Sequence, residues 1–419
     1  MDAFSFIHAS DLHLGSPFAG IGQVSKEAGE FLVSSTLGAF DRLIGLAVSR
    51  GVDFVLFSGD LFDCAERNLR ALLHFRNGVK ALEQKGIQVF IVHGNHDPLD
   101  EISGALELPG NCHVFSWENN KWKIIRKKGS PLAAVFGMSF PRRVVRDNLA
   151  RRIPAGPPGL FRIAMLHCTV GRQEGHDPYA PCALSDLTAR HGKGEPDYWA
   201  LGHVHTRKVL SEDPFVIYPG MIQGRSFAEQ GEKGAFLVRV SGDKEVTVGF
   251  HPLDVVRWQE IEIDIASLSG PGELMDQAWR CVEEARKAAG ARGLVLRIFL
   301  TGRSELSRQL GRQEALSDML SELRDGLSDV EPPLWLDSIK NRSRRPIDIE
   351  TRRQAPDLVG MLLRQTEAMK RDPQLLELAE KELSASFGKR RFMTGDMRPE
   401  EIAGLLEEAE TMLLDLLEE

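Results

Sequence analysis

The stretch FSFIHASDLH, from Phe4 to His13, places an apolar, β-like run directly before the polar residues Asp11 and His13. The arrangement recurs along the chain, where apolar runs lead into Gly59-Asp60-Leu61-Phe62-Asp63, Gly94-Asn95-His96-Asp97, His167 and Gly202-His203-Val204-His205. Side chains just beyond the carboxyl ends of buried strands in an α/β fold converge on one crevice. The pattern therefore predicts a single site.

The side chains at these strand ends are typical ligands of divalent cations. Aspartate, asparagine and histidine offer oxygen and imidazole nitrogen but no thiolate, which suits Mn²⁺, Fe²⁺ or Zn²⁺ better than a structural zinc finger. One tetrahedral ion would leave several of these groups unused, so we expect two ions bridged by Asp60, which is central in the motif order. Two ions about 3.5–4 Å apart clamp a phosphoryl group and generate a hydroxide nucleophile near neutral pH. The predicted ligands are Asp11, His13, Asp60, Asn95, His167, His203 and His205.

The five motifs, in this order, resemble those of the calcineurin-like metallophosphoesterase superfamily. Longer stretches are similar to DNA double-strand-break repair nucleases of the SbcD type, and most of all to bacterial YhaO-type exonucleases: Phe6–Gly15, Ser58–Asp63, Tyr198–His205 and Tyr218–Arg225. The resemblance implies a two-metal-dependent phosphodiesterase that cleaves DNA, as an exonuclease or endonuclease, by attack of a metal-bound hydroxide. Mn²⁺ is the expected metal, with Fe²⁺, Mg²⁺ and Zn²⁺ as alternatives. Met221 and Ser226 depart from the family pattern, in which more polar residues stand there.

The resemblance also implies a role for each matching residue. Asp11, His13, Asp60 and His205 would hold one metal, and Asp60, Asn95, His167 and His203 would hold the second. His96 would protonate the leaving oxygen or stabilise its charge, and Asp63 would orient His96. Arg225, near the last motif, is the candidate phosphate contact, because arginine matches phosphate geometry with two donors.

Alternating apolar runs and helical periodicities predict an α/β catalytic domain over residues 1–253. From Phe4 to Val92 the order is strand, helix, strand, helix, strand, which favours parallel pairing with helices on the sheet faces. Short strands follow beyond Asp97, so we expect a second sheet packed on the first, a two-sheet sandwich flanked by helices. Residues 235–240 and 245–250 are expected to complete that second sheet.

Two further regions follow the catalytic domain. Residues 254–350 mix strand and helix patterns and indicate a small α+β module, which in the resembling nucleases caps the active site and touches DNA. Residues 351–419 carry amphipathic helical stripes. These helices either bury their stripes within this chain or offer a docking face. The resemblance favours a coiled-coil SMC-like ATPase as partner, and it implies a homodimer.

Composition limits the class of protein further. The 419 residues carry a formal charge of −8, so any DNA contact must come from local patches. Five cysteines without paired spacing indicate reduced thiols and a cytoplasmic protein. The first strand begins almost at the first residue, and no apolar run approaches the roughly 18 residues of a membrane span. Neither a leader nor a membrane segment is expected.

Other polar residues have simpler interpretations. His8 and His93 precede the motifs and are expected to support ligands or the core rather than bind metal, and Cys168 should point away from His167 into the core. Short basic clusters are usually solvated, although each could contact a phosphate backbone. The clusters are Arg142-Arg143 with Arg146, Arg342 with Arg344-Arg345, and Lys389-Arg390-Arg391.

Two alternative functions stay open from the sequence. One is another enzyme of the superfamily, acting on a small phosphodiester, a nucleotide or a phosphoprotein. Phosphoprotein phosphatases carry glutamate where this chain has Asp97, which counts against the last of these. The other is a non-catalytic DNA-end-binding scaffold with an inert metal site, which would not need to retain His96.

Overall fold

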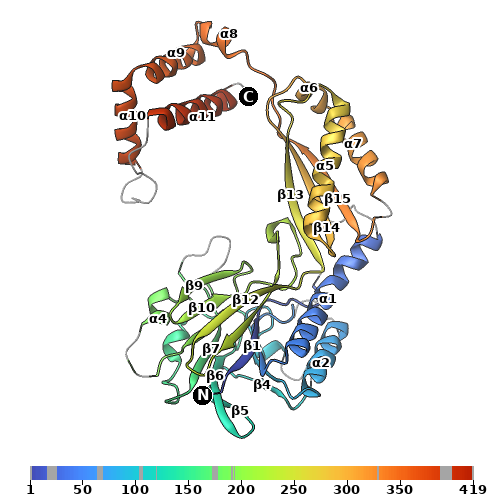
Figure 1. The fold of residues 1–419 in the computed structure, drawn as a ribbon, viewed down its shortest axis with the longest axis vertical. Coiled ribbons are helices and arrows are strands. Elements are labelled where there is room, and N and C mark those ends of the chain that lie inside the picture. Colours follow the sequence, from blue (N-terminus) through green and yellow to red (C-terminus); the bar gives the residue numbers. More distant parts are fainter. Residues whose placement is uncertain are drawn as a thin grey trace. The chain divides into compact units, whose positions relative to one another are not determined.

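The computed structural model divides the chain into two compact units (Figure 1). Unit 1 comprises Met1–Asp264, Gly270–Leu300 and Arg312–Arg342, and unit 2 comprises Ile265–Ser269, Thr301–Gly311 and Ser343–Glu419. The residues whose structure is described are 2–16, 26–63, 69–102, 107–118, 120–171, 178–189, 192, 194–327, 330–386 and 399–417.

The first sheet of unit 1 has the strand order β12-β11-β1-β2-β3-β4. Strands β1 to β4 are parallel, because α1 (Lys26–Arg50) and α2 (Leu69–Glu83) provide crossovers. Strands β11 and β12 are antiparallel additions beside β1. The strands are β1 (Phe4–Ala9), β2 (Phe54–Ser58), β3 (Gln88–Val92), β4 (Cys112–Val114), β11 (Gly234–Val240) and β12 (Val246–Pro252).

The second sheet has the strand order β5-β6-β7-β8-β10-β9, with parallel pairing from β6 through β7 and β8 to β10. Its strands are β5 (Lys123–Lys127), β6 (Ser130–Met138), β7 (Phe161–His167), β8 (Tyr198–Gly202), β9 (Lys208–Glu212) and β10 (Phe215–Tyr218). Short helices lie between strands of unit 1: α3 (Leu99–Ile102) follows β3, η1 (Ala150–Arg152) follows β6, α4 (Leu184–Thr188) follows β7, and η2 (Phe227–Glu229) follows β10. The predicted two-sheet sandwich is confirmed. The prediction that 235–240 and 245–250 belong to the second sheet is wrong, because β11 pairs with the otherwise open edge of β1.

Alternation along β1 builds both apolar layers of unit 1. Phe6 faces the second sheet and stacks on Phe54 with a centroid separation of 4.9 Å. Ile7 faces the helices and shares a core with Phe40 of α1 and Phe75 of α2. Because successive strand side chains point to opposite faces, one strand anchors both layers and fixes the position of the loop that follows it.

Helix α1 contains a stretch, Gly29–Arg50, that is long and apolar enough to cross a membrane by length and composition alone. Half of that stretch is buried inside the protein. Phe40, Leu43 and Ala47 are fully buried against the first sheet. The apolar character of α1 is therefore that of a core helix.

A three-stranded sheet with the order β13-β14-β15 follows. The elements of this part of the chain are β13 (Val256–Asp264), α5 (Pro271–Ala289), β14 (Gly293–Thr301), α6 (Leu306–Leu310), α7 (Gln313–Gly326) and β15 (Leu334–Asn341). The α+β character predicted for this region is thus present. The division of the chain at 253/254 and 350/351 stays a prediction.

The helical region at the end of unit 2 consists of α8 (Ile349–Gln354), α9 (Leu358–Arg371), α10 (Pro373–Ser386) and α11 (Pro399–Leu417). Val359 and Leu363 of α9 pack with Leu414 of α11, and Lys370 donates to Glu410 at 2.7 Å. Part of the predicted apolar stripes is therefore buried within this chain. Leu358, Met361 and Met412 remain exposed.

Candidate metal centre

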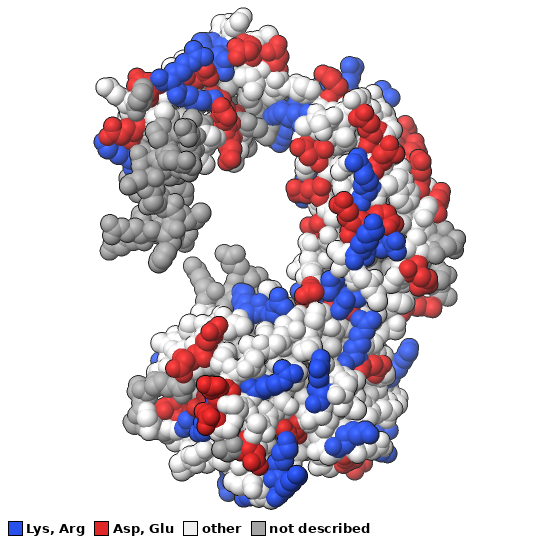
Figure 2. All heavy atoms as spheres, viewed as in Figure 1, with Lys and Arg blue, Asp and Glu red and all other residues white. Residues whose placement is uncertain are grey.

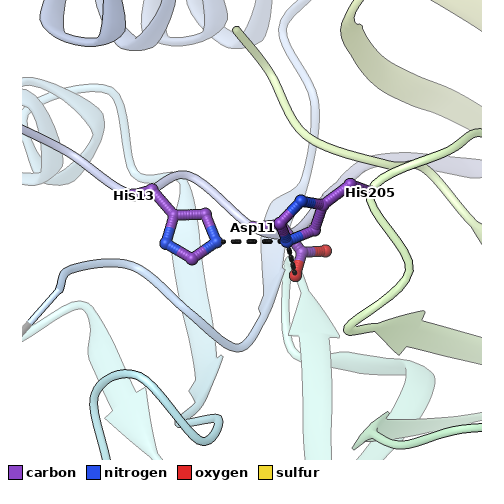
Figure 3. A group of neighbouring side chains, drawn as sticks. All are labelled: Asp11, His13 and His205. Atoms are coloured by element: carbon purple, nitrogen blue, oxygen red, sulfur yellow. Dashed lines mark hydrogen bonds and ion pairs between the residues drawn. The ribbon is translucent and has the colours of Figure 1, made fainter. Parts of the chain in front are cut away.

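The predicted ligands all lie at the carboxyl ends of parallel strands, where the two sheets meet. Asp11 and His13 follow β1, Asp60 follows β2, Asn95 follows β3, His167 ends β7, and His203 and His205 follow β8. Three groups among the described residues have ligand atoms within 4.8 Å of one another: Asp11, His13 and His205; His13, Asp63 and His96; and Asp11, Asp60 and His167. Figure 3 shows the side chains of the first group, Asp11, His13 and His205, pointing toward one another.

The loops that carry these residues are joined by backbone hydrogen bonds. The amide of Asp11 donates to the carbonyl of Gly59 at 3.0 Å, and the amide of His13 donates to that of Asp60, also at 3.0 Å. Asp11, His13, Asp60 and His203 all adopt positive φ angles, of 52°, 44°, 53° and 102°. Such conformations cost about 1–3 kcal/mol each and persist where surrounding contacts enforce them, often at functional sites.

Three glycines allow the backbone to approach His167 and Asp60. A Cβ atom at Gly59 would lie 2.2 Å from His167 Nδ1, and one at Gly94 would lie 2.3 Å from Asp60 Oδ1. A Cβ atom at Gly202 would lie 1.9 Å from the carbonyl oxygen of Ser58. The glycines of the three motifs are therefore required by close packing around the ligands.

Hydrogen bonding fixes the orientation of His167. Its Nδ1 donates to the carbonyl of Ser58 at 3.0 Å, which leaves Nε2 facing Asn95 Oδ1 at 3.0 Å and Asp60 Oδ2 at 3.3 Å. A backbone carbonyl that holds one imidazole nitrogen in this way leaves the other available as a metal ligand. His203 lies beside it, with 5.3 Å between the two ring centroids.

Asp60 faces both sides of the centre. Its Oδ1 accepts a hydrogen bond from the amide of His96 at 2.9 Å. Its Oδ2 lies 3.3 Å from His167 Nε2 and 3.9 Å from His13 Nε2. This central position is the one that a carboxylate shared by two ions requires.

Electrostatics show that the cluster fits a cation. Burial alone raises the pKa of Asp60, but the charge and hydrogen bond of His167 hold it well below its usual range. Burial likewise lowers the pKa of His167, and Asp60 overcomes this and raises it to about 9. The ion pairs that Asp11 and Asp60 make within the described chain are with histidines. Buried carboxylates in such a setting need positive charge, which divalent ions would supply.

The His205 side is held by a network of charged side chains. Glu229 Oε1 accepts from His205 Nδ1 at 3.0 Å and from Arg225 Nη2 at 3.2 Å, and the Arg225 Nη1 lies 3.5 Å from Asp63 Oδ2. Burial would raise the pKa of Glu229, but His205 and Arg225 hold it well below its usual range. Arg225, the candidate phosphate contact, is therefore engaged by two carboxylates, and its contact with phosphate stays a prediction.

His96 is the accessible imidazole of the centre, with a side chain 48% exposed. Its Nδ1 lies 2.6 Å from Asp63 Oδ1, and this contact with Asp63 raises the pKa of His96. Burial would raise the pKa of Asp63 itself, but its hydrogen bonds with His13 and His96 keep it well below its usual range. The arrangement can present a protonated imidazole to a ligand at the mouth of the site.

Two carboxylates that organise the site, the buried Asp97 and the partly buried Glu229, were not predicted from the sequence as site residues. Asp97 accepts from the amides of Gly94 at 2.8 Å, Leu61 at 2.9 Å and Asp60 at 3.2 Å, and so ties the β2 and β3 loops together. Glu229 is the other. An acidic residue at the end of a ligand motif was the available signal for Asp97, whereas Glu229 lies 24 residues beyond its histidine, where spacing gives no signal.

The structure also shows the surroundings of polar and sulfur-containing residues that were not predicted to bind metal. His93 Nδ1 contacts Asp97 Oδ2 at 3.0 Å, while His8 contacts Tyr198 and Leu201, and burial lowers the pKa of His8 to about 3. Cys168 and Met221 are fully buried. Ser226 accepts from the amide of Ala228 at 3.3 Å. The cluster Lys389-Arg390-Arg391 lies outside the described residues.

Comparison with known proteins gives the class. Residues 4–207 match the calcineurin-like phosphoesterase family, and residues 258–344 match the middle domain of metallophosphoesterase YhaO. The chain belongs to the calcineurin-like metallophosphoesterases. In particular, it is 35% identical over 332 residues to the uncharacterized metallophosphoesterase YhaO of Bacillus subtilis (strain 168), a match that covers 79% of this chain and 80% of that protein.

Two more distant relatives carry names that refer to nucleases or DNA repair. The DNA double-strand break repair protein Mre11 of Thermoplasma acidophilum is 25% identical over 254 residues, which cover 56% of this chain and 62% of that protein. A component of the nuclease SbcCD of Escherichia coli (strain K12) is 26% identical over 313 residues, which cover 66% of this chain and 74% of that protein. Membership of the family indicates a hydrolase, and the structure supplies candidate ligands for its divalent metals.

Proposed function

We propose that this chain is a two-metal-dependent phosphodiesterase that cleaves DNA, as an exonuclease or endonuclease of the double-strand-break repair type. The observation that carries the proposal is the position of Asp60 Oδ2, 3.3 Å from His167 Nε2 and 3.9 Å from His13 Nε2. The names of the two distant relatives, the repair protein Mre11 and the nuclease SbcCD, support DNA as the substrate. Figure 2 shows acidic and basic side chains interspersed on the face drawn. DNA would therefore contact small groups of basic side chains and not one broad basic surface.

The division of the ligands between two ions rests on the resemblance of the motifs to those of the family. We assign Asp11, His13, Asp60 and His205 to one ion, and Asp60, Asn95, His167 and His203 to the other. Carboxylate, amide and imidazole ligands suit Mn²⁺, with Fe²⁺, Mg²⁺ and Zn²⁺ as alternatives. When bound, a pair of such ions neutralises phosphate oxygens and lowers the pKa of water.

We propose His96 as the general acid of the reaction. Asp63 engages its Nδ1 at 2.6 Å, which leaves Nε2 to donate a proton to the departing oxygen. The raised pKa of His96 favours the protonated form that this step needs. Asp63 is a positioning residue in this scheme, because it acts through His96.

Purified protein with Mn²⁺ and end-labelled linear DNA, beside a nucleotide and a phosphopeptide, tests the proposal. Wild type should shorten or cut the DNA. His96→Ala should keep both metals and lose on the order of 10²–10⁴-fold in rate. His74→Ala serves as the control and should keep full activity, because His74 lies on α2, where its partly exposed side chain pairs with Asp41 of α1. Intact DNA with hydrolysis of the nucleotide or phosphopeptide would assign another substrate, and metal binding without any hydrolysis would indicate a scaffold.

The region 254–350 is proposed to act beside this site and to contact DNA. Trp258 Nε1 donates to the carbonyl of Gly224 at 3.0 Å, and the Arg297 guanidinium lies 3.8 Å from the centroid of the Phe227 ring. Phe227 belongs to η2, which also carries Glu229. The module is thus packed against the segment that holds His205. Replacing residues 257–345 should abolish DNA binding more than hydrolysis of a small chromogenic phosphodiester, and equal loss of both would count against the proposal.

The helical region 351–419 is proposed to dock on the coiled coil of an SMC-like ATPase, with homodimerisation as a further expectation. The exposed residues Leu358, Met361 and Met412 support a docking face, and the relative from Escherichia coli is named as one part of the larger nuclease SbcCD. A truncation after Arg352 that still co-purified with such an ATPase would contradict this. Free cysteines at 112, 168, 182 and 281 support the proposed cytoplasmic location.

A further inference from the structure

A cavity lies outside the group of metal ligands in unit 1. Its volume is about 680 Å³, which is the size of a small-molecule site. We call it the Trp117 cavity. The lining residues that matter to its chemistry are Asp100, Trp117, Arg142, Val144, Arg146 and Asp147.

The walls of the Trp117 cavity are tied to the metal centre by the backbone. The amide of Phe140 donates to the carbonyl of His93, and the amide of Leu99 donates to that of Phe140, both at 2.9 Å. The amide of Asp100 donates to the carbonyl of Pro141 at 3.1 Å. The Phe140 ring also meets His167 edge-on, with 5.7 Å between centroids. The cavity therefore begins a few residues beyond His96, at the same end of the strands.

The Trp117 cavity combines an aromatic ring with cationic groups. The Arg152 guanidinium lies 4.5 Å from the centroid of the Trp117 ring, so this indole already takes part in a stacked arrangement. Arg143 is neutralised by Glu101 through two contacts of 2.7 Å. Arg142 and Arg146 are exposed, and the structure shows no carboxylate partner for either among the described residues. The cavity thus keeps two guanidinium groups that can meet an anion.

Acidic and apolar groups complete the cavity. Asp100 and Asp147 line it with carboxylates, and Val144 is an exposed aliphatic side chain, 45% accessible. With two carboxylates and two guanidinium groups in its lining, the cavity suits a ligand that carries both hydrogen-bond donors and negative charge better than it suits free phosphate. A nucleotide has a flat ring for the indole, amino groups that donate to carboxylates, and a phosphate for arginine.

We propose that the Trp117 cavity binds one unpaired nucleotide of the DNA strand whose neighbouring phosphodiester lies at the metal centre. The base stacks in the cavity against Trp117, Asp100 or Asp147 accepts from its amino group, and Arg142 and Arg146 contact its phosphate. This inference rests on the proposed DNA substrate, and it specifies that the substrate strand is unpaired next to the cut. A free nucleotide shares the same chemistry, so the experiment must separate the two sources.

Photo-crosslinking locates the bound base directly. Wild-type protein is irradiated in EDTA, which prevents hydrolysis, with a ten-nucleotide strand carrying 5-iododeoxyuridine at successive positions. Crosslinks should form at one position and map by mass spectrometry to the peptide with Trp117 or to residues 141–147. Excess deoxynucleoside monophosphate should compete only weakly. Crosslinks that map only elsewhere would overturn the proposal, and complete competition by the mononucleotide would assign the cavity to a free nucleotide.

Variants separate the cavity from the metal centre. Trp117→Ala should weaken binding of the strand by about tenfold, the usual effect of losing a stacked base. Removing the crosslinked base from the strand should weaken binding to wild type by a similar factor, but not binding to Trp117→Ala. Equal loss in both proteins would overturn the stacking contact. Hydrolysis of bis(4-nitrophenyl) phosphate should stay unchanged throughout.

Charge reversal gives a test that does not depend on the folding of the Trp117 variant. Arg146→Glu, at an exposed position, should weaken strand binding by about tenfold and reduce its salt dependence. Lys85→Glu is the matched control, because Lys85 is exposed and precedes the amino end of β3, opposite the site. Equal effects of both reversals would overturn the proposal. If the DNA assay with Mn²⁺ shows no cleavage while these results hold, the proposed nuclease function fails and the nucleotide cavity stands.

Discussion

The two sides of the candidate metal centre are held in place by different kinds of contact. Around His167 the backbone does the positioning, through the carbonyl of Ser58 and the close approach of Gly59 and Gly94. Around His205 the positioning comes from side chains, through Glu229 and Arg225. His167 is completely buried, whereas the His205 side chain is 23% exposed. We expect backbone changes on the first side to affect folding, and side-chain changes on the second side to weaken the binding of one ion.

Asp60 joins the two sides, so its removal should have the largest effect. Asp60→Ala should lose both ions and reduce the hydrolysis rate by more than the roughly 100-fold typical of losing an outer partner of a ligand. Metal content after dialysis and the rate on bis(4-nitrophenyl) phosphate measure the two effects. Asp276→Ala, at an exposed position on α5, is the control and should change neither. A variant at Asp60 that kept one ion at full affinity would show that the carboxylate is not shared.

A methyl group at Gly59 tests whether the His167 side depends on the backbone. Gly59 has a φ of +95°, and a Cβ atom there would lie 2.2 Å from His167 Nδ1. Gly59→Ala should therefore lower the free energy of unfolding of the metal-free protein by about 3 kcal/mol or more. Urea denaturation measures this.

Gly86→Ala provides the control for backbone strain. Gly86 has a φ of +71° but open space around the position of a Cβ atom. Its substitution should cost only about 1–2 kcal/mol, because it adds left-handed strain without a collision. Equal costs at the two positions would mean that contact with His167 does not restrict residue 59.

Glu229→Gln tests the opposite expectation for the His205 side. Loss of the charge that orients His205 should weaken one ion by about 10–100-fold and leave the other bound. Metal titration followed by calorimetry measures the two affinities separately. Glu232→Gln, which removes a half-exposed carboxylate paired with Arg257, is the matched control. Simultaneous loss of both ions would show that the two sides are not independent.

The smallest expected effect is a pH dependence of stability in the metal-free protein. The pKa of His167 is raised from 6.5 to about 9, so its protonated form stabilises the fold fully below pH 6.5. That contribution is lost as the pH rises through 9, so the free energy of unfolding should decrease as the pH is raised from 6.5 to above 9. Urea denaturation between pH 6 and about 9.5 measures it. Bound metal requires neutral imidazole, so saturation with Mn²⁺ should remove the decrease, and its persistence would argue against His167 as a ligand.

Sequence patterns predicted the sandwich and the convergence of polar residues at the strand ends. They marked only the apolar, buried part of each helix or strand and so missed some of its true limits. The periodic residues 37–47 marked a helix that in fact spans Lys26–Arg50. Ala235–Val240 was recognised as a strand and assigned to the wrong sheet, because its apolar pattern does not show that it pairs with β1. Glu229 went unrecognised because it reaches His205 only after the chain has folded back.

Which residue types stand at the ends of the strands, and in what order, could be read from the sequence, because both follow from local composition. Strand formation and the glycine turns place Asp11, Asp60, Asn95 and His167 at one edge without further information. The folded chain was needed to show that Asp60 lies between His13 and His167, that Glu229 holds His205, and that Trp117 lines a cavity. These relations depend on distances between segments far apart in the chain, which periodicity and spacing do not encode.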